Sequence, residues 1–162
     1  MHVPVEDVLQ KLSKSAKLSD IKIRCGDREW PAHRAILCVR SEYFDKALSG
    51  ALKEATENTI ELHDDHPNAV HAMLEWFYSG NYSYCQTHSI FELCVLVHDV
   101  ANRHLLDDLK MCALEAFSDS EINPSNIEGF VRVTTTVYNA SLLDQPWQKV
   151  ILDVVRLSRY KF

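Results

Sequence analysis

The amino-acid sequence predicts an α+β domain in which a small sheet near the N-terminus is followed by a cluster of short helices. Apolar residues that alternate with polar ones occur in short runs before residue 65, and apolar residues that recur every three or four positions dominate after it. The chain has 162 residues, of which 46% are hydrophobic, and this suits one globular domain with a small extension.

Charge and composition exclude several classes of function. The formal net charge is −6 and the cationic side chains are scattered, so nucleic-acid binding, which needs clustered cations, is disfavoured. No apolar stretch approaches the roughly 20 residues needed to cross a bilayer, so we expect no membrane span. Residues 1–17 lack the long apolar core of a secretory signal. We expect reduced thiols in an intracellular protein of the cytoplasm or nucleus; the five cysteines are Cys25, Cys38, Cys85, Cys94 and Cys112.

The part before residue 65 predicts a helix and three strands. Alternation over 20–25 directs two isoleucines to one face of a strand, and the turn residues that follow lead into a second strand over 29–33. Pro31 lacks a backbone N–H and therefore suits the edge of the sheet. Residues 58–64 predict the third strand. An amphipathic helix is expected before the hairpin, because its apolar positions recur at i, i+3, i+4 and i+7: Val5, Val8, Leu9 and Leu12.

Helices are expected elsewhere. Two short ones lie between the second and third strands, with Ser41 as the N-cap of the second and Gly50 at its end. Another begins at Pro67 and ends at Gly80. Further helices are expected over 89–103 and 105–117 and, after a polar break over 118–126, from Ile127 and from Trp147 onward. The expected buried face of the helix after the break is Ile127, Phe130, Val131, Thr134, Val137 and Tyr138.

Histidine and aspartate pairs raise the question of a metal site. A metal-dependent hydrolase of the helical His-Asp type would use a doublet such as His98-Asp99, but adjacent helical residues diverge by about 100°, so Asp99 leaves the face of His98. Residues 63–66 contain two histidines and two aspartates that could chelate a metal. Alternatively, Asp65 or His66 caps the helix that follows. An aspartate there also interacts favourably with the positive end of the helix dipole. We predict no metal site and keep the hydrolase as a remote alternative.

No pattern of an enzyme active site is present in the sequence. It contains no Gly-rich phosphate loop, no Gly-x-Ser-x-Gly elbow and no Cys-x-x-Cys pair. Cys85 has no local partner that would make it a nucleophile. We therefore predict no catalytic residue and no cofactor, and expect a protein-interaction module.

The corner between the second strand and the helix after it carries a family resemblance. The stretch SDIKIRCGDREWPAHRAILCVRSEYFDKAL resembles the signature of the BTB/POZ domain, an aspartate that opens the first strand, a hairpin, then His-Arg-x-x-Leu and Ser-x-Tyr-Phe. The match continues through LKEATENTIELHDDHPNAVHAMLEWFYSGNY, covers residues 18–117 and looks most like the fungal BTB proteins. The signature residues are Asp20, His33, Arg34, Leu37, Ser41, Tyr43, Phe44 and Gly80.

The resemblance implies a BTB/POZ fold and three parts of the chain. Residues 1–17 are the N-terminal helix and a candidate dimer element, residues 18–120 are the BTB/POZ domain, and residues 121–162 are a helical extension similar to the start of a BACK region. At the corner, Asp20 and His33 are the polar residues that the family places at this junction. We expect a structural role, a partly buried histidine hydrogen-bonded to the backbone or to a carboxylate.

The resemblance also implies binding without catalysis. BTB domains commonly form homodimers through the N-terminal helix, here through Val5, Val8, Leu9 and Leu12, although this helix could instead fold back on its own subunit. Many are substrate adaptors of Cullin-3 ubiquitin ligases with a hydrophobic-x-Glu motif before the third strand. The matching residues are Leu52, which would fill an apolar pocket on the cullin, and Glu54, which would pair at its rim.

The alternative is an oligomerising BTB scaffold with no ligase role. An adaptor must hold its substrate, and no kelch, zinc-finger, MATH or ankyrin region follows in this sequence. Either the chain is a fragment of a longer protein, or the helices after Asn123 recruit the substrate.

Overall fold

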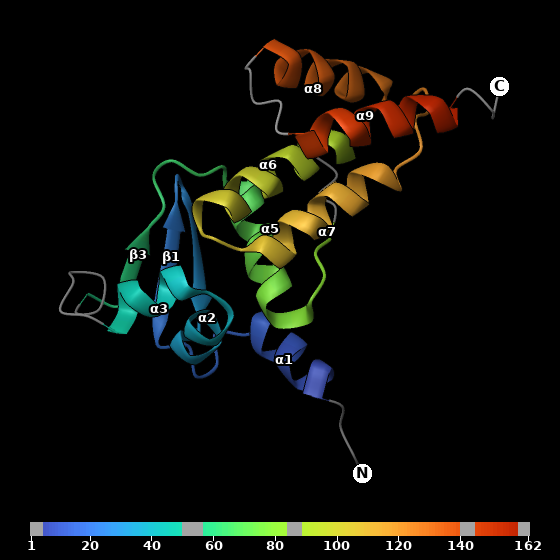
Figure 1. Cartoon of the computed structure of the whole chain (residues 1–162). Helices are drawn as coiled ribbons and strands as arrows, with labels where there is room; N and C mark the ends of the chain where they lie inside the picture. The colour runs from blue at the N-terminus through green and yellow to red at the C-terminus, as the bar shows by residue number, and fades with distance from the viewer. Residues whose placement is uncertain (1–4, 50–56, 84–88, 140–144, 159–162) are drawn as a thin grey trace. The chain divides into compact units, whose positions relative to one another are not determined.

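The computed structural model describes residues 5–49, 57–83, 89–139 and 145–158 (Figure 1). Its short sheet near the N-terminus and the helices that follow confirm the α+β class. The chain divides into two compact units. The first comprises Met1–Ser83 with Val100–Leu106, and the second comprises Tyr84–Asp99 with Asp107–Phe162.

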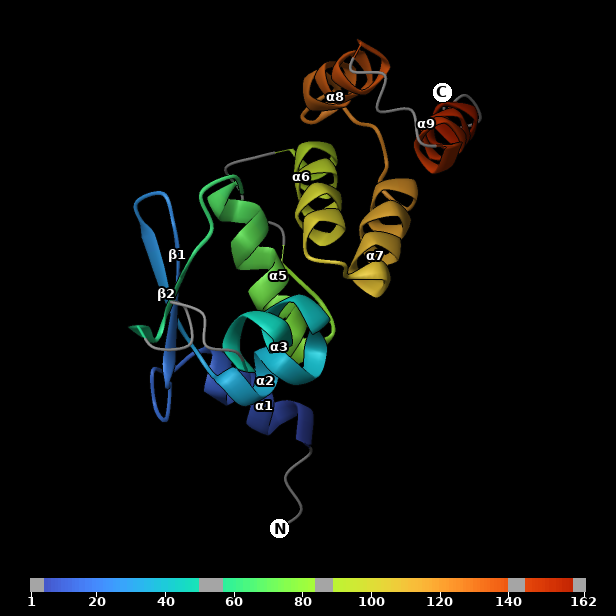
Figure 2. The same cartoon turned by 60° about the vertical axis from the view of Figure 1, so that its left-hand side comes forward.

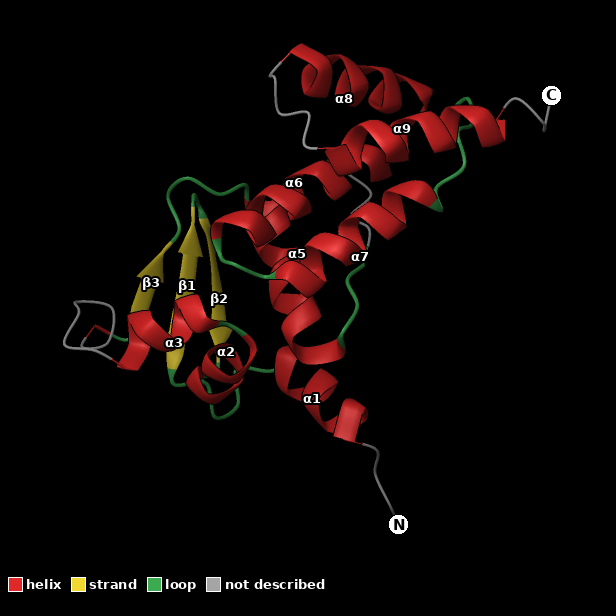
Figure 3. Cartoon of the chain, viewed as in Figure 1, coloured by secondary structure: helices red, strands yellow, loops and turns green. Residues whose placement is uncertain are grey.

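The sheet of the first unit has the strand order β2-β1-β3 (Figure 3). Strand β1 (Ile21–Cys25) pairs antiparallel with β2 (Arg28–Ala32) and parallel with β3 (Thr59–Glu61). Residues of β1 are alternately buried and exposed in the predicted phase. Gly26 takes a φ of 57° in the hairpin turn, a conformation that suits glycine. Pro31 lies opposite Lys22 on the edge strand β2, as predicted.

Four helices of the described chain complete the first unit, and Figure 2 shows α2, α3 and α5 on one side of the sheet. Ser41 caps α3, because its Oγ accepts a hydrogen bond of 3.4 Å from the N–H of Phe44. Gly80 ends α5 with a φ of 74°. Gly50 lies outside the described residues. The helices are α1 (Val5–Ser13), α2 (Arg34–Arg40), α3 (Glu42–Ser49) and α5 (Pro67–Ser79).

The cap of α5 decides between two sequence predictions. Pro67 is the first helical residue, and the N–H of Asn68 donates to Nδ1 of His66 at 3.2 Å. The side chain of Asp65 is bonded elsewhere, to Arg103 and His104. His66 is therefore the cap, and of the two predicted alternatives Asp65 was wrong. Its carboxylate is bonded instead to the guanidinium of Arg103 and the imidazole of His104, which are distant in the sequence.

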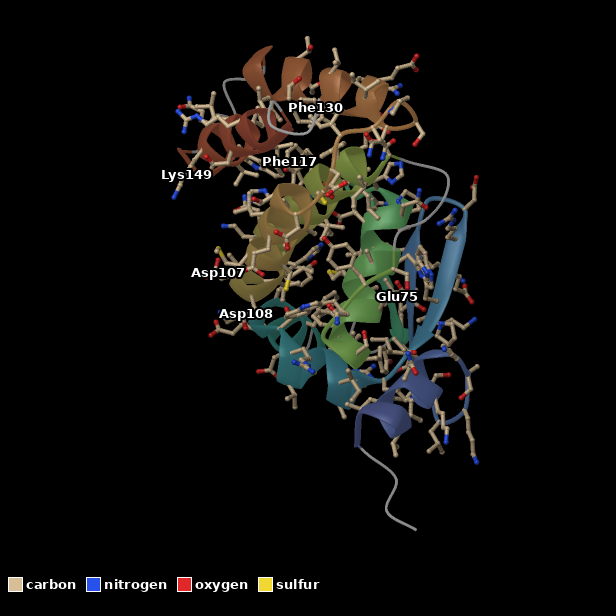
Figure 4. All side chains as sticks on the ribbon, turned by 90° about the vertical axis from the view of Figure 1, so that its right-hand side faces the viewer. Glu75, Asp107, Asp108, Phe117, Phe130 and Lys149 are labelled. Carbon is tan, nitrogen blue, oxygen red and sulfur yellow. The ribbon has the colours of Figure 1, made fainter. Side chains whose placement is uncertain are left out.

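Aromatic rings fill the core of the second unit. The ring of Phe117 lies 4.9 Å from that of Phe91 and 5.2 Å from that of Trp147, measured between centroids. Figure 4 shows Phe117 and Phe130, whose rings are 6.1 Å apart. The helices that carry this core are α6 (Ile90–Arg103), whose last turn belongs to the first unit, α7 (Asp107–Ser118), α8 (Ile127–Asn139) and α9 (Gln145–Ser158).

The buried face of α8 differs from the predicted one. Phe130 and Val137 are buried as predicted, but Ile127 is 47% exposed and Val131 is 55% exposed. Val133, which the pattern left out, is buried in their place. Periodicity alone could not locate this face, because the apolar residues of α8 cover a wider arc than the face that is buried.

A glycine sets the rotation of α8. A Cβ atom at Gly129 would overlap the Oγ of Ser89, so only glycine lets α8 approach the start of α6 this closely. There Ser89 and Glu92 form a capping box, in which each side chain accepts a hydrogen bond from the other's backbone N–H, at 3.3 and 3.2 Å. Glu92 also pairs with Arg132 of α8 at 2.9 Å. The close contact at Gly129 and this ion pair together direct Val133 rather than Val131 inward.

Candidate functional site

The imidazole of His33 lies at the corner between β2 and α2 and is 8% exposed. Its Nε2 is 3.0 Å from the carbonyl oxygen of Lys17, and its Nδ1 is 2.7 Å from the hydroxyl of Tyr78. A carbonyl oxygen can only accept, so Nε2 carries the proton and Nδ1 accepts from the phenol. The Tyr78 oxygen in turn accepts from the backbone N–H of His33 at 3.2 Å. His33 is therefore a fully bonded structural residue.

The aspartate of the signature has a different partner from the histidine. Oδ1 of Asp20 accepts a hydrogen bond of 2.8 Å from the N–H of Arg34, the first residue of α2. This bond satisfies one of the donors that every helix leaves free at its start. Of the two partners expected for His33, the backbone is present, but the polar side chain is a phenol rather than a carboxylate. Burial raises the pKa of Tyr78, and so keeps this phenol neutral.

The other signature residues build the core around this corner. Leu37 and Phe44 are completely buried, Ser41 caps α3, and Gly80 ends α5. The ring of Tyr43 packs against those of two neighbouring residues, Phe44 at 5.1 Å and His104 at 4.6 Å. The guanidinium of Arg34 contacts Leu48 and Asn58. These contacts are within the first unit and give every described signature residue a packing or bonding role.

The apolar stripe of α1 is only partly covered. This helix packs against α5 of the same chain. Val8 remains 45% exposed, and Leu9 and Leu12 are half-buried. The side chain of Val5 is outside the description. Folding back on its own subunit, one of the two expectations for this helix, is therefore seen, but it leaves apolar surface in contact with solvent.

A cavity of about 660 Å³ lies between α1, β2 and α5. Lys14 and Gln10 line it from the side of α1, and Trp30 lines it from β2. Glu75, which is labelled in Figure 4, lines it from α5. The carboxylate of Glu75 is held by the N–H of Ser83 at 2.8 Å. The polar face of α1 therefore forms this wall, and its apolar stripe lies on another side of the helix.

Asp65, Arg103 and His104 form a cluster that the sequence did not predict. The side chains of Asp65 and His104 are 4% and 5% exposed, and Asp65 Oδ2 lies 2.8 Å from His104 Nε2. Asp65 Oδ1 accepts from Nε of Arg103 at 2.7 Å. Burial alone would raise the pKa of Asp65, but the hydrogen bonds and charges of His104 and Arg103 outweigh it and hold this pKa below its ordinary value. The cluster joins the turn before α5 to the end of α6.

The residues considered for metal chemistry do not come together. Nδ1 of His98 accepts a hydrogen bond of 3.4 Å from the indole N–H of Trp147, which makes His98 a core residue of the second unit. Asp99 lies 3.9 Å from the same nitrogen and is half exposed. Among residues 5–49, 57–83, 89–139 and 145–158, no three histidine, cysteine, aspartate or glutamate side chains are placed to hold a metal ion.

The described cysteines are free thiols, of which Cys25 and Cys94 are buried and Cys38 and Cys112 are half-buried. Burial raises the pKa of Cys25 and Cys38, which makes both poor nucleophiles at neutral pH. Cys85, Leu52 and Glu54 lie outside the described residues. Within the described ranges, no helix has both the length and the apolar character needed to span a membrane.

Comparison with known proteins identifies the family. A sequence model of the BTB/POZ domain matches residues 9–111, so the chain belongs to the BTB/POZ domain family. Its fold is similar to that of the BTB domain of human gigaxonin, with a TM-score of 0.54, 22% identity and coverage of 71% of this chain and 95% of that one.

Among curated proteins the chain is similar to Kelch-like protein 25. Identity to the Homo sapiens protein is 27% over 153 residues, which are 93% of this chain and 25% of that protein. Identity to the Xenopus tropicalis protein is 29% over 124 residues, which are 76% of this chain and 20% of that protein. The chain thus spans about a quarter or less of these relatives. Both are vertebrate proteins, so an affinity to fungal BTB proteins remains a prediction.

The first prediction concerns the corner. Tyr78→Phe should lower the free energy of unfolding by about 1–3 kcal/mol, because Nδ1 and the N–H of His33 both lose a partner in a buried place. His33→Ala should also destabilise, and the double variant should lose less than the sum, because the two residues share the same bonds. Denaturant unfolding measures all three. Ser79→Ala, which removes an exposed hydroxyl from the same helix, is the control. Near-wild-type stability of His33→Ala would contradict the assignment.

The second prediction concerns Asp65. Its pKa is lower in the folded state, so its contribution to stability is complete above the unfolded pKa, near 3.9, and is lost as pH falls through the folded pKa. Asp65→Asn should therefore be less stable than wild type at neutral pH, and the difference should shrink as the pH drops below about 4. Unfolding curves measured over a pH series test this. The exposed neighbour provides the control variant Asp64→Asn, and a constant difference across the series would refute the prediction.

Proposed function

We propose that this chain is a protein-interaction module that self-associates and acts as a substrate adaptor for a Cullin-3-type ubiquitin ligase in the cytoplasm or nucleus. The observation that carries the proposal is the BTB/POZ domain over residues 9–111 in a chain similar to Kelch-like proteins. In this proposal the chain binds proteins and transforms no substrate.

The argument for self-association rests on α1. An amphipathic helix gains most of its stability from burial of its apolar face, and Val8 stays 45% exposed when α1 packs on α5. A second copy of the chain would cover the same stripe on both subunits, as a two-fold interface requires. The scaffold alternative needs only this contact, and the exposed stripe supports it equally.

The argument for cullin binding rests on the sequence LKE and on the family. Leu52 is the apolar anchor and Glu54 is the charged residue of a hydrophobic-x-Glu motif before β3. A buried apolar anchor with a charge at its rim is the usual arrangement of a small binding hot spot. In this proposal the substrate is bound either by a further region, such as the part of the longer relatives that this chain does not span, or by the helices after Asn123.

The third prediction separates an adaptor from a scaffold. Leu52→Asp should abolish binding to the N-terminal domain of Cullin-3, because a buried carboxylate without a partner is strongly unfavourable in an apolar pocket. Titration calorimetry with purified proteins measures the affinity. Ala51→Asp adds the same charge one residue earlier, outside the motif, and should bind like wild type. Equal binding of the Leu52→Asp variant, or no binding by wild type, would leave the scaffold as the function.

The fourth prediction concerns self-association. The wild-type chain should be a dimer by light scattering at tens of micromolar, and Val8→Asp should shift it toward monomer, because the new charge would be desolvated in the contact. Gln10→Asp places the same charge on the polar face of α1 and is the control. A monomeric wild type, or equal effects of the two variants, would exclude α1 as the dimer element.

A further inference from the structure

We infer that the cavity between α1, β2 and α5 binds an arginine side chain from an extended segment of a partner protein. The cavity has a volume of about 660 Å³, which lies in the range of cavities that bind ligands. Its lining residues all belong to the first unit. The inference is independent of the proposed cullin contact, because it uses neither Leu52 nor Glu54.

One face of α5 forms one side of the cavity. The lining residues on this helix recur at i, i+3, i+4, i+7 and i+8, so helical geometry places them next to one another. They are His71, Leu74, Glu75, Tyr78 and Ser79. This face therefore combines apolar surface with one carboxylate. An arginine side chain, which has an apolar stem and a charged head, matches such a surface.

The carboxylate of Glu75 (Figure 4) is fixed in place and has no lysine or arginine partner among the described residues. Its Oε2 accepts from the N–H of Ser83 at 2.8 Å, and its Oε1 accepts from the hydroxyl of Ser83 at 3.4 Å. Oε1 also lies 3.9 Å from Nε2 of His71, which is charged only when protonated. A carboxylate has about four acceptor positions, so two N–H groups of a guanidinium can still bind to Glu75.

The indole of Trp30 lines the cavity from β2 and provides an aromatic surface. Its ring lies 6.3 Å from that of His71, and in the described part of the chain no cation lies over it. Guanidinium groups stack favourably on indoles. The protein already contains such a pair, in which Cζ of Arg40 lies 5.7 Å from the ring centroid of Trp76. An arginine suits Trp30 and Glu75 better than a lysine, because its planar group can stack and pair with a carboxylate at the same time.

The side of the cavity formed by α1 suits the backbone of the same segment. Gln10 and Lys14 line it, and both side chains can donate hydrogen bonds. The carbonyl groups of an extended segment have no partner within the segment, so they are free to accept these bonds. The ammonium of Lys14 would repel a second cation, which favours a single arginine over a run of basic residues.

Titration of the full chain with the capped pentapeptide Gly-Gly-Arg-Gly-Gly, followed by nuclear magnetic resonance, tests the inference. The signals of the Trp30 indole N–H and the Ser83 amide should shift and saturate. The same peptide with citrulline, a neutral isostere of arginine, should bind at least about tenfold more weakly. Glu75→Gln and Trp30→Leu should each weaken binding of the arginine peptide by about tenfold. The control is Glu61→Gln, which removes a carboxylate from the outer face of the sheet and should bind like wild type.

Several results would overturn the inference. Equal affinity for the arginine and citrulline peptides would mean that the carboxylate does not select a cation. Shifts that leave Trp30 and Ser83 unchanged would place binding elsewhere, and no shift at the highest soluble peptide concentration would mean that the cavity does not bind arginine. If Glu75→Gln converts a wild-type dimer to a monomer, the occupant is a second copy of this chain and not a separate partner. If Trp30→Leu does not fold, Glu75→Gln and the citrulline peptide decide, since this substitution keeps the shape of the side chain.

Discussion

The imidazole of His33, at the start of α2, is bonded to two segments that are distant in the sequence: the turn at Lys17 and the last turn of α5 at Tyr78. Only one tautomer satisfies all of its bonds. Because these groups are buried, loss of one bond leaves a donor or an acceptor without water to replace the partner. The hairpin, α2 and α5 therefore depend on one neutral hydrogen-bond network, and the next residue along the chain, Arg34, extends the same corner to β3.

Most of the ion pairs near the sheet, unlike the hydrogen bonds of His33, lie at the surface. On the outer face of the sheet Lys22 and Arg24 pair with Glu29, and Arg24 also pairs with Glu61. These side chains are about half exposed, and such pairs contribute little to stability. Asp65 is the contrasting case, because its buried carboxylate is held by two donors from α6 and its end. The carboxylate of Asp65 is thus accepted in a buried place because both of its oxygens have a donor.

Most of the fold could be predicted from local patterns, because alternation located β1 and Ser41 marked the start of α3. The His33 corner was predicted in position and with a backbone partner, but Tyr78 was not found, since no local pattern links residues separated by 45 positions. The sequence left Asp65 and His66 as alternative caps of α5 for the same reason, because the partners of Asp65 lie 38 and 39 residues away. The rotation of α8 depended on the missing side chain of Gly129, and hydrophobic periodicity does not report such an absence.

Pro31 has a consequence for the behaviour of the chain at high concentration. The outer strand β2 is a place where a strand of another molecule could add by backbone pairing. Pro31 offers no N–H there, and the partly exposed carboxylate of Glu29 on the same strand opposes the close stacking found in amyloid. Backbone pairing along the β2 edge is thus disfavoured, and a partner that approaches this edge meets side chains, whose shape and charge can discriminate between partners.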